Sequence, residues 1–142
     1  HLTKMNPSVV GADVDACFAH FARRMGDLAL QSEANRTRVL LLGGVELLVN
    51  LLDKAGDDSV VEGAAIALSN LALAEQGRTA IIAAGGMEPL VRILSQALND
   101  GAVAASAGAL RNMACGVEGR ERIIALGGVE LLVKHCASKD AP

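Results

Sequence analysis

Apolar and polar positions recur along the chain with a fixed period. The clearest marker is a glycine pair followed by an apolar run, which reads GGVELLVNLL at residue 43, GGMEPLVRIL at residue 85 and GGVELLVKHC at residue 127, a step of 42 residues each time. A second block, LSNLAL at 68–73, returns as LRNMAC at 110–115, with GDLAL at 26–30 as a degenerate copy. Self-similarity at one period of this length predicts a repeat architecture.

Each period divides into three predicted helices. Short amphipathic helices end at the glycine pairs, because glycine readily adopts the left-handed conformation that closes a helix. Longer helices are apolar or small on nearly every face, which is typical of helices between the layers of a stack. We expect short helices at 35–42, 77–84 and 119–126, outer helices at 45–55, 87–97 and 129–137, and longer inner helices at 59–74 and 102–115.

Local signals refine this pattern. Ser59 and Glu62 have the spacing of a capping box at the start of an inner helix. Residues 6–8, Asn-Pro-Ser, are typical of a turn before the first helix. An arginine also recurs seven residues before the first glycine of each pair. We expect it to donate hydrogen bonds to carbonyl groups of the adjacent inner helix, with partner binding as the alternative. These arginines are Arg36, Arg78 and Arg120.

The chain therefore reads as one repeat domain over residues 1–142. We divide it into the remnant of an inner helix at 11–34, complete repeats at 35–76 and 77–118, and a truncated repeat at 119–137. No unit can bury its apolar faces alone, so each depends on its stacked neighbours. We expect either a slice of a longer array or self-association through open repeat ends.

Composition narrows the possible partners. Hydrophobic residues make up 51% of the chain, yet the only aromatic residues are Phe18 and Phe21, which favours closely packed helices over a β-sandwich. The net charge is −3 with intermixed signs, which argues against nucleic acid as a partner. No apolar run reaches the ~18 residues of a transmembrane segment.

The three cysteines are widely spaced and form no C-x-x-C pair. They are Cys17, Cys115 and Cys136. This pattern fits reduced thiols in an intracellular, cytoplasmic protein. Cys115 falls within the inner-helix pattern, so we expect it to be a small buried residue.

The repeated blocks resemble the armadillo repeat. The resemblance rests on LLLGGVELLVNLL with VVEGAAIALSNLAL, and on IIAAGGMEPLVRIL with AVAASAGALRNMAC in the next copy; it covers about residues 11–137. It implies an all-α fold, a right-handed α-solenoid of three-helix repeats whose third helices line a concave groove. HEAT repeats are the nearest alternative architecture.

The resemblance also implies that the groove holds an extended peptide through a ladder of asparagines. The matching residues are Asn70 and Asn112, with Asp27 in the degenerate first copy. An amide side chain offers a donor and an acceptor to a peptide main chain. The alternative is that these amides only hydrogen-bond a neighbouring loop.

Residues near the ladder set this chain apart from relatives that bind nuclear localisation signals. Those relatives carry tryptophan one turn before the asparagine, where this chain has Arg23, Ile66 and Gly108, so we do not expect binding of that type. Arg23 and Arg111 are candidates for meeting an acidic partner, with solvation at the surface as the alternative. Glu62 completes the predicted groove residues.

No group of side chains predicts catalysis. The glycine pairs follow helices and lack the Lys-Ser/Thr of a phosphate-binding loop. We therefore predict a protein that is not an enzyme, has no cofactor or metal, and binds a partner peptide along the inner-helix groove. Two alternatives stay open: a structural module that oligomerises or docks through repeat faces and open ends, and a regulator or chaperone of a folded client.

Overall fold

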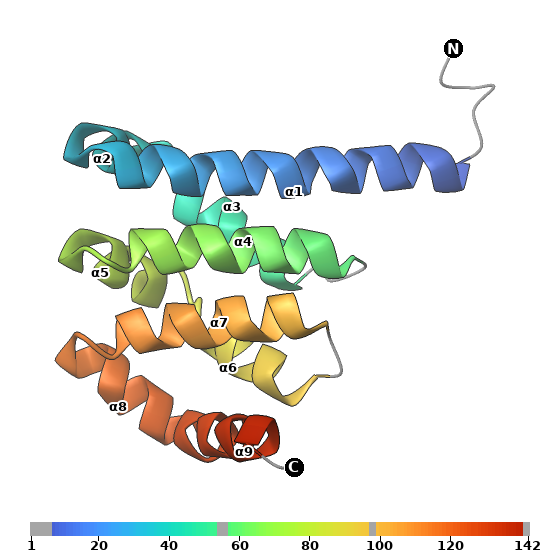
Figure 1. Ribbon diagram of the computed structural model, residues 1–142. Coiled ribbons are helices and arrows are strands. Elements are labelled where there is room, and N and C mark those ends of the chain that lie inside the picture. Colours follow the sequence, from blue (N-terminus) through green and yellow to red (C-terminus); the bar gives the residue numbers. More distant parts are fainter. Residues whose placement is uncertain (1–6, 54–56, 97–98, 141–142) are drawn as a thin grey trace.

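The computed structural model describes residues 7–53, 57–96 and 99–140, with the side chains of 7–13 and 138–140 excluded. The described residues form nine α-helices joined by short turns, as Figure 1 shows. They are α1 (Pro7–Gln31), α2 (Glu33–Leu41), α3 (Gly44–Asp53), α4 (Asp58–Leu71), α5 (Glu75–Ala83), α6 (Met87–Ser95), α7 (Asp100–Met113), α8 (Val117–Ala125) and α9 (Gly128–Asp140).

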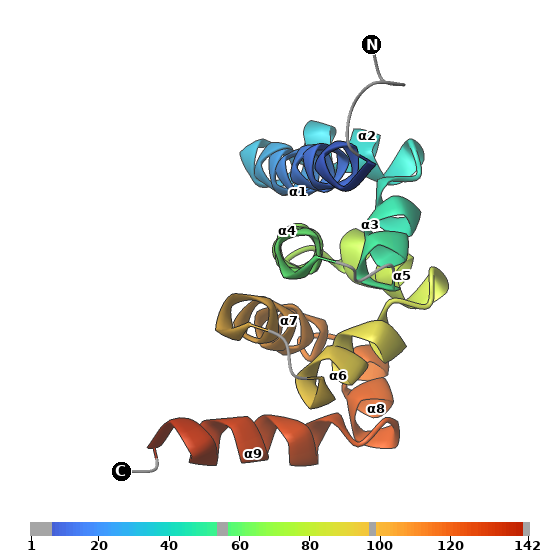
Figure 2. The same cartoon turned by 90° about the vertical axis from the view of Figure 1, so that its right-hand side faces the viewer.

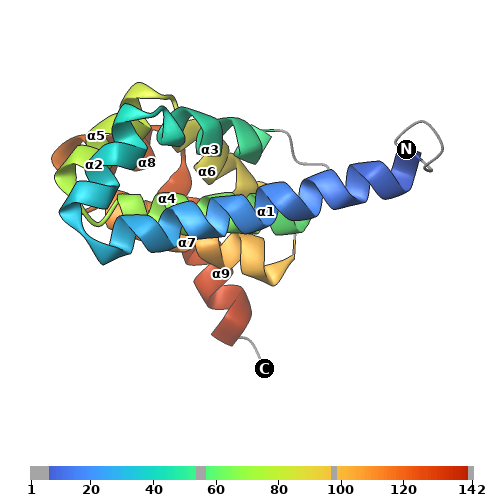
Figure 3. The same ribbon diagram turned by 90° about the horizontal axis from the view of Figure 1, so that it is seen from above.

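The helices are arranged in two layers that run the length of the stack. The inner layer consists of α1, α4 and α7, which lie side by side and make the most extensive helix–helix contacts (Figure 2). The remaining helices lie behind them, except that α9 continues beneath α7 and projects beyond the inner layer (Figures 2 and 3). The expected all-α solenoid of three-helix repeats is confirmed.

Aliphatic side chains fill the space between the two layers. The largest of them are completely buried, because each helix presents its apolar face both to its own repeat and to the next one. These residues are Leu48, Leu68, Leu71, Ile81, Leu90 and Leu110. Buried residues of this cluster run continuously from α1 to α8, so one core serves all the repeats.

The glycine pairs end the short helices as the sequence predicts. Gly43, Gly85 and Gly127 have φ angles of 79°, 74° and 76°, in the left-handed region that favours glycine. The chain then turns directly into α3, α6 and α9. This confirms the role assigned to the pairs.

Two other glycines allow a short helix to touch an inner helix. A Cβ atom on Gly77 would lie 1.8 Å from the carbonyl oxygen of Leu71, and one on Gly119 would lie 2.0 Å from that of Met113. The equivalent residue of the first copy is Asn35, where Ser32 caps the helix by accepting a hydrogen bond from the Asn35 N–H at 3.0 Å. The backbone path therefore differs at the junction of α1 and α2.

The recurrent arginines also behave differently in the first copy and in the two later copies. Arg78 donates to the carbonyl of Ala72 at 3.0 Å, and Arg120 donates to that of Ala114 at 2.9 Å, so the structural role is confirmed for these two. The Nε of Arg36 is buried and has no hydrogen-bond partner among the described residues. The altered junction after α1 explains why the first copy does not repeat the contact.

The prediction of a turn at residues 6–8 is wrong. Helix α1 begins at Pro7, so Pro7 and Ser8 are helical and not part of a turn, whereas Asn6 lies outside the described residues. Proline is tolerated there because the first turn of a helix needs no backbone N–H. The predicted ends of two outer helices, residues 54–55 and 97, also lie outside the described residues.

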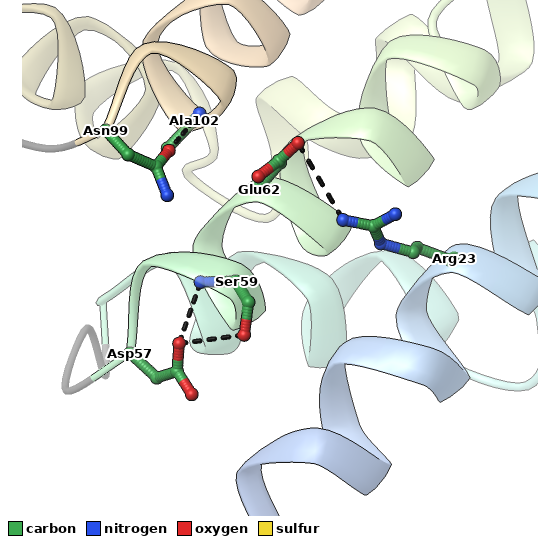
Figure 4. Close-up of polar contacts among 6 residues, drawn as sticks. All are labelled: Arg23, Asp57, Ser59, Glu62, Asn99 and Ala102. Carbon is green, nitrogen blue, oxygen red and sulfur yellow. Dashed lines mark hydrogen bonds and ion pairs between the residues drawn. The ribbon is translucent and has the colours of Figure 1, made fainter.

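Helix α4 is capped by Asp57, not by Ser59. The Asp57 carboxylate accepts hydrogen bonds from the Ser59 backbone N–H at 2.8 Å and from its hydroxyl at 2.7 Å (Figure 4). Those two bonds, the hydroxyl first, lower the pKa of Asp57 below its usual value. Asp57 has extended backbone angles, which suit an N-cap.

Candidate functional site

The predicted site residues all lie on the three inner helices. We call these positions together the inner face, whether exposed or buried. They are Arg23 and Asp27 on α1, Glu62, Ile66 and Asn70 on α4, and Gly108, Arg111 and Asn112 on α7. Each inner helix contributes at least two of these residues, because the repeat places equivalent positions side by side. The burial and the hydrogen bonds of each residue differ, and these two properties determine which residues are free to meet a partner.

Arg23 and Glu62 connect α1 to α4. The guanidinium Nη2 lies 3.7 Å from Oε1 of Glu62, with about half of the Arg23 side chain and a quarter of the Glu62 side chain exposed (Figure 4). The Glu62 carboxylate also lies against the first turn of α7, where a Cβ on Gly101 would be 2.6 Å from Oε1. Both charges therefore have a partner within the chain, which reduces what they can offer an external one.

Asn112 is buried between α7 and α4. Its Nδ2 donates to the Ser69 carbonyl at 2.8 Å and to the Ser69 hydroxyl at 3.1 Å. Its Oδ1 accepts a longer bond of 3.4 Å from Nε of Arg111. The Asn112 amide therefore joins two inner helices. This is close to the alternative that these amides only hydrogen-bond a neighbouring loop, but here the partner lies in a helix.

Asn70 differs from Asn112 although both occupy the same repeat position. It is half-buried, and no hydrogen bond of its amide is found among the described residues. Its Nδ2 faces Gly26 of α1, where an added Cβ would lie 3.0 Å away. The third ladder residue, Asp27, is exposed. Asn70 and Asp27 are thus the ladder positions that a partner can reach.

The inner face is shallow over α7. Gly108 is half-buried, and a Cβ there would meet only the Ser69 hydroxyl, at 3.6 Å. Ala104, one turn earlier, is exposed. On α4, the residue equivalent to Gly108 is Ile66, which is half-buried. Its side chain is smaller than the tryptophan that forms the wall of a lysine slot in relatives that bind nuclear localisation signals. The lack of an aromatic slot for a lysine side chain follows from these residues.

Three exposed apolar residues at equivalent repeat positions were missed by the sequence analysis. Leu30, Leu73 and Cys115 each stand three residues after a ladder position, and the two leucines are 54% and 58% exposed. Cys115 is exposed as well, so the expectation that it is buried is wrong. The signal was present in the last letter of the blocks LAL, LAL and MAC. Leu30 lies on α1, whereas Leu73 and Cys115 lie in the turns that follow α4 and α7.

Next to Cys115, an open hollow of about 410 Å³ lies between α5 and the turn that joins α7 to α8. Apolar atoms from Ile82, Met113 and Val117 line it together with Cys115, and Arg78 borders it. Val117 is 63% exposed. Glu75, Thr79 and Glu118 line the hollow as well, so its walls are of mixed polarity.

The described part of the chain has neither a metal-binding cluster nor a helix that could span a membrane. In residues 7–53, 57–96 and 99–140, no three His, Cys, Asp or Glu side chains come close enough together to hold a metal ion. None of the described helices combines the length and apolar character needed to cross a membrane.

Comparison with known protein families matches the armadillo/beta-catenin-like repeat at residues 32–73 and 75–115. The chain belongs to this family. Both matches end where an inner helix ends or just beyond it, and together they include Glu62, Asn70 and Asn112. Comparison with curated proteins finds no match.

Solved structures similar to this armadillo-repeat chain include engineered proteins. One, described only as an engineered protein, is 36% identical with a TM-score of 0.80, over 87% of this chain and 50% of its own. A designed armadillo repeat protein in complex with the peptide (KR)4 is 27% identical with a TM-score of 0.72, over 78% of this chain and 46% of its own. Computationally designed armadillo repeat proteins for modular peptide recognition are 26% identical, with a TM-score of 0.72, over 80% of this chain and 48% of their own. The chain spans about half the length of these structures.

Proposed function

We propose that this armadillo-repeat chain is a non-enzymatic binding module that holds an extended peptide segment of a partner protein along its inner face. The observation that carries the proposal is the Asn70 amide, which is half-buried on α4 without a hydrogen bond among the described residues. A peptide main chain supplies the N–H and C=O that such an amide can bind together. The designed relative in complex with a peptide supports this mode of binding for the family.

The surroundings of Asn70 indicate which peptides suit the inner face. Leu30, Leu73 and Cys115 are exposed and each follows a ladder position by three residues, so we expect a peptide with apolar side chains at alternate positions. The nearby charges are mixed, and Glu62 is already paired with Arg23. A purely basic peptide such as (KR)4 is therefore a poor match, in contrast to the designed relative.

The proposal includes the absence of a cofactor and an intracellular, cytoplasmic location for the full protein. Armadillo repeats are generally non-catalytic binding modules, which supports the first part. The three cysteines of the chain are exposed and unpaired, which supports the second. The partner is a protein or an extended peptide.

Selection from an unbiased peptide display library tests this function. The wild type should enrich peptides with apolar residues at alternate positions, and Asn70→Ala should weaken the binding of those peptides about 2- to 10-fold through the lost amide contacts. Asn50→Ala is the matched control, since Asn50 is exposed on α3 in the outer layer. No enrichment by the folded protein, or equal losses in Asn70→Ala and Asn50→Ala, would refute the proposed binding face.

A further inference from the structure

The hollow of about 410 Å³ between α5 and the turn before α8 lies within the stack. Helices α5 and α8 follow each other along one edge of the molecule (Figure 1). Cys115 and Val117, which line the hollow, are exposed, and so are their equivalents Leu73 and Glu75, which have described repeats on both sides. The openness of this edge is therefore a property of the repeat itself.

Part of the lining is apolar. Ile82 of α5 and Val117 of α8 contribute to it, together with Met113 of α7, whose side chain is completely buried. Val117 is 63% exposed, and its equivalent in the preceding repeat is the acidic Glu75. An aliphatic surface at the side of a hollow allows the methylene groups of another side chain to lose contact with water.

The charges that line the hollow are unbalanced. Glu75 lies in the first turn of α5 and Glu118 in the first turn of α8; both are exposed, and neither forms an ion pair with another described residue. Among the described residues that line the hollow, Arg78 alone is basic, and its Nη1 already donates to the Ala72 carbonyl at 3.0 Å. The excess of carboxylates favours a cation in the hollow.

Lysine and arginine side chains combine the two properties that this lining requires. Each has an apolar methylene stem and a positively charged end. An acidic side chain would be repelled by Glu75 and Glu118. A purely apolar side chain would cover the two carboxylates without giving them a partner.

The hollow also lies close to the proposed peptide. Cys115 lines it and follows the ladder position Asn112 by three residues, at the C-terminal end of α7. Asn70 stands at the same end of the neighbouring inner helix α4. Packed helices lie about 8–10 Å apart, and an extended peptide advances ~3.3 Å per residue. A peptide held by Asn70 therefore reaches the level of the hollow about three residues further on.

We propose that the hollow receives one lysine or arginine side chain of the bound peptide, about three residues from the residue that Asn70 holds. The methylene stem lies against Ile82 and Val117, and the positive charge pairs with Glu75 and Glu118. This inference rests on the proposed peptide binding and adds a requirement to it. Among the apolar residues of the peptide, a single basic residue at a fixed position selects the partner.

Peptides from the display selection test this requirement. Peptides whose binding is weakened by Asn70→Ala should share a lysine or arginine at one position. Its replacement by methionine, which keeps an unbranched apolar stem, should weaken binding about 3- to 10-fold at low salt. The double variant Glu75→Gln/Glu118→Gln should lose affinity for the basic peptide by a similar factor, and its affinity for the methionine peptide should equal that of the wild type.

A control variant separates the hollow from the general charge of the protein. Glu46 and Glu88 are exposed glutamates in the first turns of α3 and α6, so Glu46→Gln/Glu88→Gln should bind both peptides as the wild type does. Unchanged binding of the methionine peptide also shows that Glu75→Gln/Glu118→Gln is folded.

The possible failures are distinguishable. Selected peptides without a shared basic residue, an unchanged affinity of Glu75→Gln/Glu118→Gln for the basic peptide, or equal losses for both peptides would overturn this inference alone, since binding would still depend on Asn70. If no peptide is selected, or if none is weakened by Asn70→Ala, the peptide binding and the basic residue are both refuted.

Discussion

Replacement of Gly77 by alanine should destabilise the protein substantially. The new Cβ would lie 1.8 Å from the carbonyl oxygen of Leu71, so α5 and the end of α4 must separate by more than about 1 Å to restore an ordinary contact. Overpacking of this kind costs about 1–3 kcal/mol, and backbone is harder to move than a side chain, which places Gly77→Ala at the upper end. The better helix propensity of alanine returns up to ~1 kcal/mol. We therefore expect a net loss of about 2 kcal/mol in the free energy of unfolding.

Gly108→Ala is the matched control. A Cβ at Gly108 would meet only the Ser69 hydroxyl, at an ordinary distance of 3.6 Å. The residue lies inside α7, so the gain in helix propensity should stabilise the protein by about 0.5–1 kcal/mol. The same chemical change thus has opposite signs at the two positions.

Urea denaturation followed by circular dichroism measures both effects. With a slope of about 1–3 kcal/mol per molar urea, Gly77→Ala should lower the midpoint by roughly 1 M, and Gly108→Ala should raise it by a few tenths of a molar. An increase for both variants would show that α5 does not touch α4 as the structure places it. The reasoning about the junction would then fail.

Further predictions concern the remaining local contacts. Arg78→Ala removes the donor to the Ala72 carbonyl and should cost about 1–2 kcal/mol in urea denaturation, whereas Arg36→Ala, where Nε has no partner among the described residues, should cost clearly less. The pKa of Asp57 is lower in the folded than in the unfolded protein, so its charge stabilises the fold above the ordinary pKa of 3.8 and ceases to do so as the pH falls through the folded pKa. The difference in stability between wild type and Asp57→Ala should therefore shrink in acid. A difference that does not depend on pH would contradict the cap. All three cysteines should react with a thiol reagent in the absence of denaturant, and protection of Cys115 would contradict its exposed position.

The sequence predicts features that a single chain segment determines. The helices, their order and the left-handed glycines follow from periodicity and from the backbone freedom of glycine, and the structure reproduces them. The start of α4 was harder, since Asp57, Asp58 and Ser59 are all good capping residues. Only the extended backbone at Asp57 selects among them.

Contacts between repeats explain what the sequence could not predict about the site. Asn70 and Asn112 occupy equivalent positions, but Ser69 offers Asn112 a hydroxyl and a carbonyl, whereas the residue that faces Asn70 is Gly26. Whether a ladder amide is free to bind a partner therefore depends on a residue of the preceding inner helix, Ser69 for Asn112 and Gly26 for Asn70, which stands 43 or 44 positions earlier in the chain. The exposure of Leu30, Leu73 and Cys115 was missed for another reason. Apolar residues in a helical repeat are normally expected to be buried in the core.

The difference between these two asparagines offers the most direct test of the account. The affinity for a display-selected peptide and the urea midpoint should be measured for Asn70→Ala and Asn112→Ala separately. We expect Asn70→Ala to lower the affinity about 2- to 10-fold with an unchanged midpoint, and Asn112→Ala to lower stability by about 1–2 kcal/mol with little change in affinity. Equal losses of affinity in both variants, with no loss of stability in Asn112→Ala, would contradict the assignment of Asn70 to the partner and Asn112 to the fold.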